Sequence, residues 1–393
     1  MGFIFLDRTA LSYIVPALVE ELSITNSQVS QVVMWQTIGF AIVGPVIGVL
    51  SDKTGKRKII LIAAVIATSI FSALSALANS FTYLLFIRFL VGAAEGPILP
   101  IAMTMVASVS TKGNFGRNAG IVNAGVAVIA TTLGPLIVTQ LITLTTWRWA
   151  FVLIGIPSLV LGFIIWKFTA EVRTVLSKVE ESESTIKSSF LAVFKYRNVN
   201  ISILIFICCM AGLWILYSFA PLYLTSVSHF SIPKMGLIMS LMEILQIGST
   251  IIVPLFSDYY GRKTALVLFS LLAVLAPLGL YIAPSGWIGA GALIIFGGLL
   301  GSIAPIFQNI IPSESVSIQL IATSSAFIIG LGEILGSVIL GMAGTYADSF
   351  GLTFMMIIAS ISALVMAVFG LFLKETNKRN SKVIVTNKTA KQS

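Results

Sequence analysis

The most regular feature of the sequence is a series of long apolar runs separated by short polar stretches. A helix that crosses a membrane needs about 20 mainly apolar residues, because only a helix satisfies its own backbone groups inside lipid. Breaks at charged residues, Gly and Pro divide the chain into twelve such runs. The predicted spans are residues 1–20, 31–50, 58–78, 83–107, 119–144, 148–168, 200–226, 235–256, 265–284, 287–310, 319–344 and 352–373.

The twelve spans fall into two groups of six on either side of a charged stretch. We predict an N-terminal six-helix half over residues 1–169, a cytoplasmic linker over 170–199, a C-terminal six-helix half over 200–373 and a basic cytoplasmic tail over 374–393. The expected fold class is therefore all-α, a polytopic membrane protein built from two pseudo-symmetric halves.

Composition and charge support the membrane class and orient the chain. Hydrophobic residues make up 57% of the sequence and charged residues 10%, which excludes a soluble globular domain. The net charge of +9 does not indicate a nucleic-acid partner, because 20 of the 24 Lys and Arg residues fall in the predicted inner loops and tail. The outer loops carry only Arg148 and Lys234. The positive-inside rule then places both termini in the cytoplasm of a multi-pass protein of the plasma or inner membrane.

The start of the chain is unusual for a first span. It lacks the pattern of a cleavable signal peptide, since the first apolar run contains Asp7 and Arg8. Only six residues precede Asp7. We therefore expect either that the natural chain begins upstream of Met1 or that the first helix is short at its inner end.

A loop motif is repeated in the two halves at an offset of 206 residues. Each copy follows the second helix of its half, which indicates a six-helix unit used twice. We expect the motif to act in gating, with an acid that pairs with a nearby arginine and holds the inner side closed. The alternative is a basic topology determinant with no further role. The motif residues are Gly48, Asp52, Gly55, Arg57, Asp258, Gly261 and Arg262.

Four charged residues lie in the interior of predicted spans of the N-terminal half, away from the span ends. Asp7 and Arg8 are in the first span, and Arg88 and Glu95 are in the fourth. At about 1.5 Å per residue, Asp7 and Glu95 share a layer near the middle of the membrane, whereas Arg88 lies roughly 10 Å nearer the outside. Arg88 and Glu95 are thus too far apart to pair closely with each other. Intramembrane charges are costly and usually functional, so these four are the main candidate site.

The balance of these charges suggests a proton-dependent anion site. With all four groups ionised the cluster is neutral, and protonation of the two acids leaves two arginines that can bind a carboxylate through their planar forks. We therefore assign Asp7 and Glu95 to proton coupling and Arg8 and Arg88 to substrate binding. The alternative is a purely structural set of ion pairs that holds the N-terminal bundle together.

The C-terminal half and span five offer further polar candidates. Trp214 and Tyr217 lie near the middle of the seventh span and are expected to cover a substrate. Glu243, Glu333 and Asn123 either line the cavity or form hydrogen bonds between helices. No Lys or Arg lies inside residues 200–226, which argues against a dianionic substrate.

The loop motif and the 6+6 layout resemble the major facilitator superfamily over essentially the whole chain. Within it, the chain resembles the anion:cation symporter family, which carries hexonates, hexuronates, sialic acid and related anions. The resemblance implies the same roles for the acids and arginines in spans one and four. It rests on Asp7-Arg8, on Arg88-xxx-Gly92-xx-Glu95-Gly96, on Trp147-Arg-Trp-Ala-Phe151 and on Pro221-x-Tyr-Leu224.

The sequence therefore predicts a secondary active transporter and no enzyme. We expect proton-coupled uptake of a small organic anion, such as a sugar acid or another monocarboxylate, by alternating access in a monomer without a cofactor. Na⁺ remains an alternative co-ion. A proton-coupled efflux antiporter is the second hypothesis, although the glycine-rich pattern of drug antiporters is reduced here to Gly134-Pro135. A non-transporting sensor or a defective transporter is the third.

Overall fold

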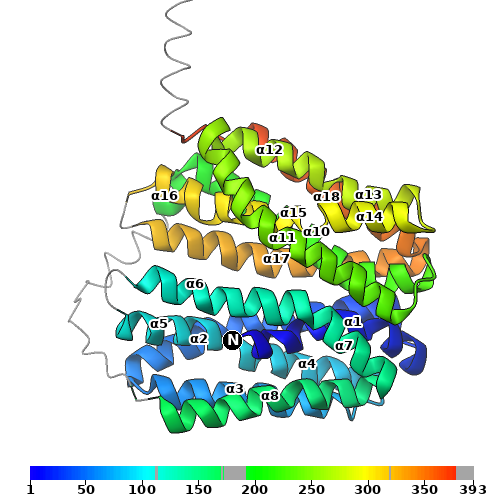
Figure 1. The fold of residues 1–393 in the computed structure, drawn as a ribbon. Coiled ribbons are helices and arrows are strands. Elements are labelled where there is room, and N and C mark those ends of the chain that lie inside the picture. Colours follow the sequence, from blue (N-terminus) through cyan, green and yellow to red (C-terminus); the bar gives the residue numbers. More distant parts are fainter. Residues whose placement is uncertain (111–113, 170, 172–191, 318–319, 378–393) are drawn as a thin grey trace, which may run out of the picture. The chain divides into compact units, whose positions relative to one another are not determined.

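The computed structural model describes residues 1–110, 114–169, 171, 192–317 and 320–377. Every regular element within these ranges is a helix (Figure 1). Most of the predicted linker over 170–199, and the predicted tail beyond residue 377, lie outside the described residues.

The first group of helices follows the chain from residue 2 to residue 168. Its members are α1 Gly2–Leu22, α2 Asn26–Thr54, α3 Arg57–Ser75, α4 Phe81–Glu95, α5 Ile98–Val109, α6 Phe115–Gly125, the π-helix η1 Val126–Thr132, α7 Leu133–Leu144 and α8 Trp147–Phe168.

The second group follows from residue 193 to residue 371. Its members are the 3₁₀ helix η2 Val193–Lys195, α10 Arg197–Ser226, α11 Ile232–Tyr260, α12 Arg262–Ala273, α13 Leu275–Ile282, α14 Trp287–Phe296, α15 Leu299–Pro305, the π-helix η3 Ile306–Ile310, α16 Ile311–Ser315, α17 Ile321–Phe350 and α18 Leu352–Leu371.

Twelve helical stretches of the described chain are long and apolar enough to span a membrane, which confirms the predicted number of spans. Several are longer than predicted. The clearest case is α2, which begins at Asn26 because Thr25 and Gln28 form a capping box, each side chain accepting a hydrogen bond from the other residue's backbone N–H. The apolar pattern alone does not show such a polar first turn.

The chain forms two compact units, whose boundaries cut through α10, α11 and α17. Unit 1 comprises Met1–Ser177, Tyr217–Glu243 and Leu340–Leu352, and unit 2 comprises Lys178–Leu216, Ile244–Ile339 and Thr353–Ser393. The first unit thus joins the N-terminal helices to one end of three later helices. The predicted boundaries at residues 169 and 200 stay a prediction.

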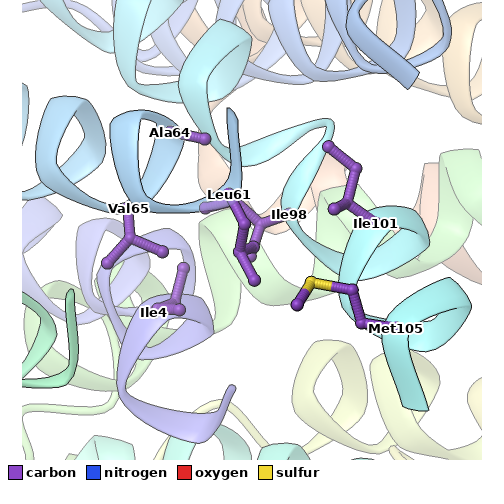
Figure 2. Packing of buried hydrophobic residues seen from close by; sticks show 7 residues of the cluster. All are labelled: Ile4, Leu61, Ala64, Val65, Ile98, Ile101 and Met105. Carbon is purple, nitrogen blue, oxygen red and sulfur yellow. The ribbon is translucent and has the colours of Figure 1, made fainter. Parts of the chain in front are cut away.

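Unit 1 is built on two long helix pairs, α2 with α4 and α3 with α8 (Figure 1). Near the predicted inner end, aliphatic side chains of α1, α3 and α5 pack together, as Figure 2 shows for Ile4, Val65 and Ile101. In unit 2, α13 packs on α14 and α12 on α15. Close van der Waals packing of this kind drives helix association inside lipid. Burial of apolar surface from water cannot do so there, because the lipid tails are themselves apolar.

Candidate functional site

A buried ion pair joins α1 to α4 in unit 1. Arg88 is 0% exposed and Asp7 is 3% exposed, and an Arg88 Nη2 atom lies 3.2 Å from Asp7 Oδ2. The other Asp7 oxygen accepts a short hydrogen bond from the Ser72 hydroxyl of α3. The Asp7 charge is therefore compensated from two neighbouring helices.

The Arg88 guanidinium is held on several sides. Its Nη2 also donates to the backbone oxygen of Asp7 at 3.3 Å, and Nε and Nη2 donate to Gln36 Oε1 of α2 at 3.4 and 3.2 Å. The ring of Phe151 lies 5.2 Å from the guanidinium carbon, within range of a cation–π contact. Nη1 is buried without a hydrogen-bond partner. One donor of this arginine is thus left for a group outside the described chain.

The close approach of α2 to α4 depends on Gly92. A Cβ atom on Gly92 would lie 1.9 Å from the backbone oxygen of Gln36, which no side chain can tolerate. Glycine at this position lets the two backbones touch, so that Gln36 reaches Arg88 from the facing helix. A small residue one turn from the arginine is thus part of how the sequence builds the site.

Glu95 ends α4 and is 1% exposed. Neither of its carboxyl oxygens makes a hydrogen bond of normal geometry among the described residues, although the Gln36 side chain lies close enough to interact with the carboxyl. Asp7, Arg8 and Arg88 are all close enough to act on this carboxyl electrostatically. Arg8 is half-buried, and its guanidinium carbon lies 4.2 Å from the centre of the Phe40 ring.

The structure therefore brings the four predicted charged residues together in one cluster. Helix spacing places the Arg88 backbone roughly 10 Å from the layer of the acids, yet the long arginine side chain closes this distance and pairs with Asp7. Two arginines and two acids balance each other's charge, and three of the four, Asp7, Arg88 and Glu95, are buried. Four further buried polar atoms make no hydrogen bond of normal geometry among the described residues and so keep hydrogen-bonding capacity in the cluster: Gln36 Nε2, Arg88 Nη1 and both Glu95 oxygens.

The remaining polar candidates are divided between the two units. In unit 1, the Glu243 carboxyl is a hydrogen-bond partner of the Tyr217 and Thr131 hydroxyls. Asn123 is exposed on α6, and its Nδ2 donates to the Ala119 backbone oxygen at 3.2 Å.

The two other candidates, Trp214 and Glu333, lie in unit 2. Trp214 is half-buried on α10. Glu333 is half-buried on α17, close enough to act electrostatically on Cys209 of α10. Their proposed place in a cavity stays a prediction.

The first loop motif makes the ion pair that its sequence predicts. Gly55 ends α2 in the left-handed conformation at φ 66°, and its N–H donates to the Ser51 oxygen at 3.0 Å. Asp52 Oδ1 lies 2.7 Å from Arg57 Nη2 across this turn. Glu171 accepts a hydrogen bond of 2.9 Å from the Lys58 N–H at the start of α3. Gly48 has open space beside it.

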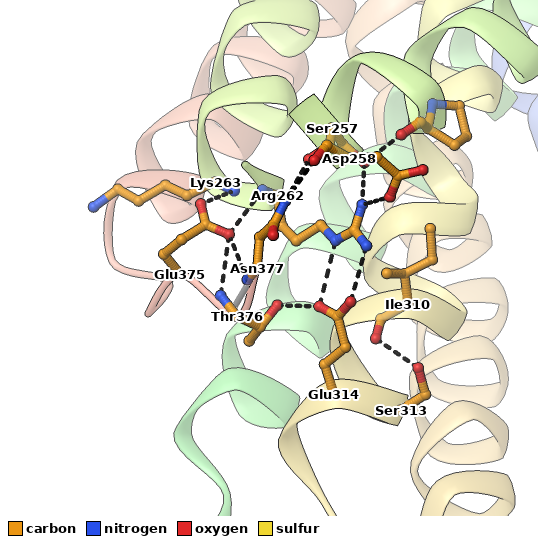
Figure 3. Close-up of polar contacts among 11 residues, drawn as sticks. Ser257, Asp258, Arg262, Lys263, Ile310, Ser313, Glu314, Glu375, Thr376 and Asn377 are labelled. Atoms are coloured by element: carbon orange, nitrogen blue, oxygen red, sulfur yellow. Dashed lines mark hydrogen bonds and ion pairs between the residues drawn. The ribbon is translucent and has the colours of Figure 1, made fainter. Parts of the chain in front are cut away.

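The second loop motif repeats this arrangement and adds to it (Figure 3). Arg262 pairs with Asp258 and also with Glu314 at 2.9 Å, and Gly261 precedes it at φ 100°. Glu375 accepts hydrogen bonds from the backbone N–H groups of Arg262 and Lys263 at 2.9 and 3.1 Å. An acid beyond the sixth span of each half thus caps the third helix of that half.

Sequence reasoning missed several partners of the predicted residues. Gln36 and Ser72 are polar residues within apolar runs, but nothing along their own helices shows that they face Arg88 and Asp7. Thr131 and the capping acids Glu171 and Glu375 were likewise not singled out. A polar side chain at mid-span is the only signal that could have marked the first three.

A cavity of about 370 Å³ opens between α2, α3 and α4 on a different face of these helices. Its lining is apolar throughout and includes Val43, Phe71, Leu90 and Ala93. It offers no group that could bind a carboxylate, so the charged cluster remains the candidate site.

Comparisons with known proteins agree with the fold. Residues 1–319 match the family model of the Major Facilitator Superfamily. The hexuronate transporter of Bacillus subtilis is 27% identical over 371 residues, covering 88% of this chain and 87% of that protein. The sialic acid transporter NanX of Escherichia coli is 25% identical over 390 residues, covering 94% and 91%. The probable sulfoacetate transporter SauU of Cupriavidus necator is 22% identical over 360 residues, covering 88% and 79%.

Solved structures show the same fold at lower identity. A bacterial homologue of the human lysosomal transporter Spinster, in an inward-facing and unoccupied conformation, superposes with a TM-score of 0.81 at 17% identity, covering 94% of this chain and 93% of that one. A D-xylose–proton symporter superposes with a TM-score of 0.75 at 15% identity, covering 96% and 97%. With twelve candidate membrane helices, a matching family model and relatives that are all transporters, the chain is a multi-pass membrane protein and belongs to the Major Facilitator Superfamily.

Proposed function

We propose that the protein is a proton-coupled symporter that takes up a small organic anion, with a sugar acid or another monocarboxylate as the substrate class. Relatives named as transporters of hexuronate, sialic acid and sulfoacetate support an anionic substrate. The protein works as a monomer, with both termini in the cytoplasm, by alternating access between its two six-helix halves.

The observation that carries the proposal is the burial of the Glu95 carboxyl among charged residues. Its carboxyl is almost fully buried and makes no ion pair or hydrogen bond of normal geometry among the described residues, yet it stands beside Gln36, two arginines and a second acid. A proton on this group removes one negative charge from a balanced cluster. The excess positive charge then attracts an anion, and release of the proton expels it.

The contacts favour Glu95 over Asp7 as the main proton carrier. Asp7 is paired with Arg88 and accepts from Ser72, so its charge is compensated within the chain. Glu95 has charged neighbours and the Gln36 side chain nearby, but it makes no ion pair and no hydrogen bond of normal geometry among the described residues. We retain Asp7 as the second coupling residue, because the Arg88 that it holds is also within range of Glu95.

The substrate carboxylate is assigned to Arg8 and Arg88, and Trp214 and Tyr217 are assigned to the rest of the molecule. Arg8 is half-buried, whereas Arg88 is fully buried and offers only Nη1. We therefore assign the first contact with the anion to Arg8. Asp52–Arg57 and Asp258–Arg262 keep their proposed role in closing the inner side.

The test is uptake of labelled monocarboxylates by proteoliposomes under an inward proton gradient. We expect the native protein to accumulate a sugar acid, and Glu95→Gln to exchange the substrate without gradient-driven accumulation. Glu20→Gln is the matched control, because Glu20 is an exposed glutamate near the end of α1 and should leave uptake unchanged. Accumulation by Glu95→Gln at the native level would remove Glu95 from coupling.

Other outcomes separate the alternatives. Accumulation driven by a sodium gradient and not by a proton gradient would identify Na⁺ as the co-ion. Accumulation only under an outward proton gradient would indicate an antiporter. Specific binding without transport under any gradient would favour a sensor.

A further inference from the structure

A further buried carboxyl lies in unit 1, at Glu243 of α11. It is 1% exposed, and no Lys, Arg or His of the described chain forms an ion pair with it. The hydroxyls of Tyr217 on α10 and Thr131 on η1 are its hydrogen-bond partners, and Oε1 has none. The buried Tyr13 of α1 is close enough to interact with it electrostatically.

Glu243 is the last of three contacts along one face of α11. Gly236, Ser240 and Glu243 are spaced four and three residues apart, so they lie in one line on the helix. A Cβ on Gly236 would collide with the Thr139 side chain of α7. The Ser240 hydroxyl donates to the Thr132 oxygen at 2.6 Å.

The partners of these three positions run in the opposite direction along the chain, at residues 139, 132 and 131. Within unit 1, α11 therefore lies against the π-helix η1 and α7 over about 10 Å. This is the end of α11 that the sequence predicts to face outside. Glu243 is buried only as long as this contact persists.

A similar contact exists at the same predicted end between α2 and α17. Asp348 of α17 accepts hydrogen bonds from the N–H groups of Asn26 and Ser27 at 2.7 and 3.0 Å, which caps the start of α2. The Ser30 hydroxyl lies 3.4 Å from the Gly341 oxygen. The predicted outer ends of α11 and α17 are thus both closed against N-terminal helices in unit 1.

We propose that Glu243 is a proton-binding residue, additional to Asp7 and Glu95, whose neutral form holds the predicted outer end of the transporter closed. A carboxyl buried without a cation is stable only when protonated, and it can then share hydrogen bonds with Tyr217 and Thr131. Ionisation leaves an unpaired charge between α1, η1 and α10. The charge is relieved when α11 moves away and the carboxyl meets water, to which its proton is released.

The direction in which proton binding at Glu243 is linked to closure of the outer end agrees with proton-driven uptake. A proton bound from an acidic outside neutralises Glu243 and favours closure over the substrate, whereas a high outside pH favours the open state. The groups near the carboxyl on the neighbouring helices are the phenols of Tyr13 and Tyr217 and the hydroxyl of Thr131. The inference rests on the family of the chain and does not need the substrate to be an organic anion.

The test follows opening with a cysteine at Thr139, which is fully buried against α11. The native cysteines at 208 and 209 are replaced by serine, and a membrane-impermeant maleimide is added outside proteoliposomes at a series of pH values. Labelling of Thr139→Cys is divided at each pH by that of Thr145→Cys, an exposed position at the end of α7, to remove the pH dependence of the thiol itself.

We expect this normalised labelling rate to rise with pH in the background that retains Glu243, by up to tenfold per pH unit for a single linked proton. Glu243→Gln, which mimics the protonated group, should label slowly at every pH. Glu20→Gln should keep the pH dependence, because Glu20 is an exposed glutamate near the end of α1. Neither result requires substrate, so a failure here is distinct from a failure of anion uptake.

The same pH dependence in Glu243→Gln as in the parent would overturn the proposal. So would a flat profile in the parent. Glu243→Asp guards against loss of folding, since it retains an acid and should restore the pH-dependent labelling.

Discussion

The buried pair of Asp7 and Arg88 gives the sharpest energetic prediction. Asp7→Asn removes the negative charge but keeps a side chain of the same shape that can still bond to Ser72. At the N–O distance of 3.2 Å and an effective dielectric constant of about 20, the direct attraction is about 5 kcal/mol. Arg88 keeps its bonds to Gln36 and to the Asp7 backbone, so we expect a net loss of about 3 kcal/mol in the free energy of unfolding.

The assay is unfolding by SDS in mixed micelles, followed by the loss of helical circular dichroism. Asp7→Asn is compared with Arg88→Met and with the double variant Asp7→Asn/Arg88→Met, in which neither charge is left unpaired. We expect the double variant to be more stable than the sum of the two single losses predicts, because each single change strands a buried charge.

Asp52→Asn is the matched control for burial. Asp52 and Arg57 are closer, at 2.7 Å, but the Asp52 side chain is 58% exposed, so we expect a loss below about 1 kcal/mol. The reasoning would be refuted if Asp7→Asn cost no more than Asp52→Asn. Strict additivity of Asp7→Asn and Arg88→Met would also refute it, since the two side chains would then not be coupled.

Two further predictions concern helix packing and helix capping. Gly92→Ala places a methyl group 1.9 Å from the Gln36 backbone oxygen, so we expect a loss of about 1–3 kcal/mol in the same SDS assay; Gly48→Ala, with open space around it, should be neutral, and equal losses would contradict the packing argument. Glu375→Ala removes the acceptor for two N–H groups at the start of α12 and should cost about 1 kcal/mol. No change in its unfolding midpoint would show that water replaces this cap.

The number of membrane-spanning helices could be predicted from the sequence. Each span can be recognised by itself, because a helix that crosses the hydrocarbon core needs about 20 mainly apolar residues. This constraint acts on each helix separately. The charged cluster was visible for the same reason, since Asp7, Arg8, Arg88 and Glu95 stand out against apolar neighbours. The ion pair of Asp52 with Arg57 was readable because only a short turn separates them.

Contacts between helices could not be predicted from the sequence in this way. Depth along a helix placed Arg88 in a different layer from Asp7, but pairing also depends on side-chain length and on how each helix is rotated. The role of Gln36 follows from the close approach that Gly92 permits between α2 and α4. Neither the rotation nor the approach leaves a periodic signal in one sequence.

Glu243 shows the same division most clearly. The sequence by itself determined that an acid lies inside the eighth span, because the surrounding residues are apolar. Only the tertiary structure decided that this acid bonds to Tyr217 and Thr131 from two other helices, lies within electrostatic range of Tyr13, and forms no ion pair within the described chain. The physical reason is that hydropathy is a property of each segment alone, whereas the partner of a buried charge is set by helices that are distant in the chain.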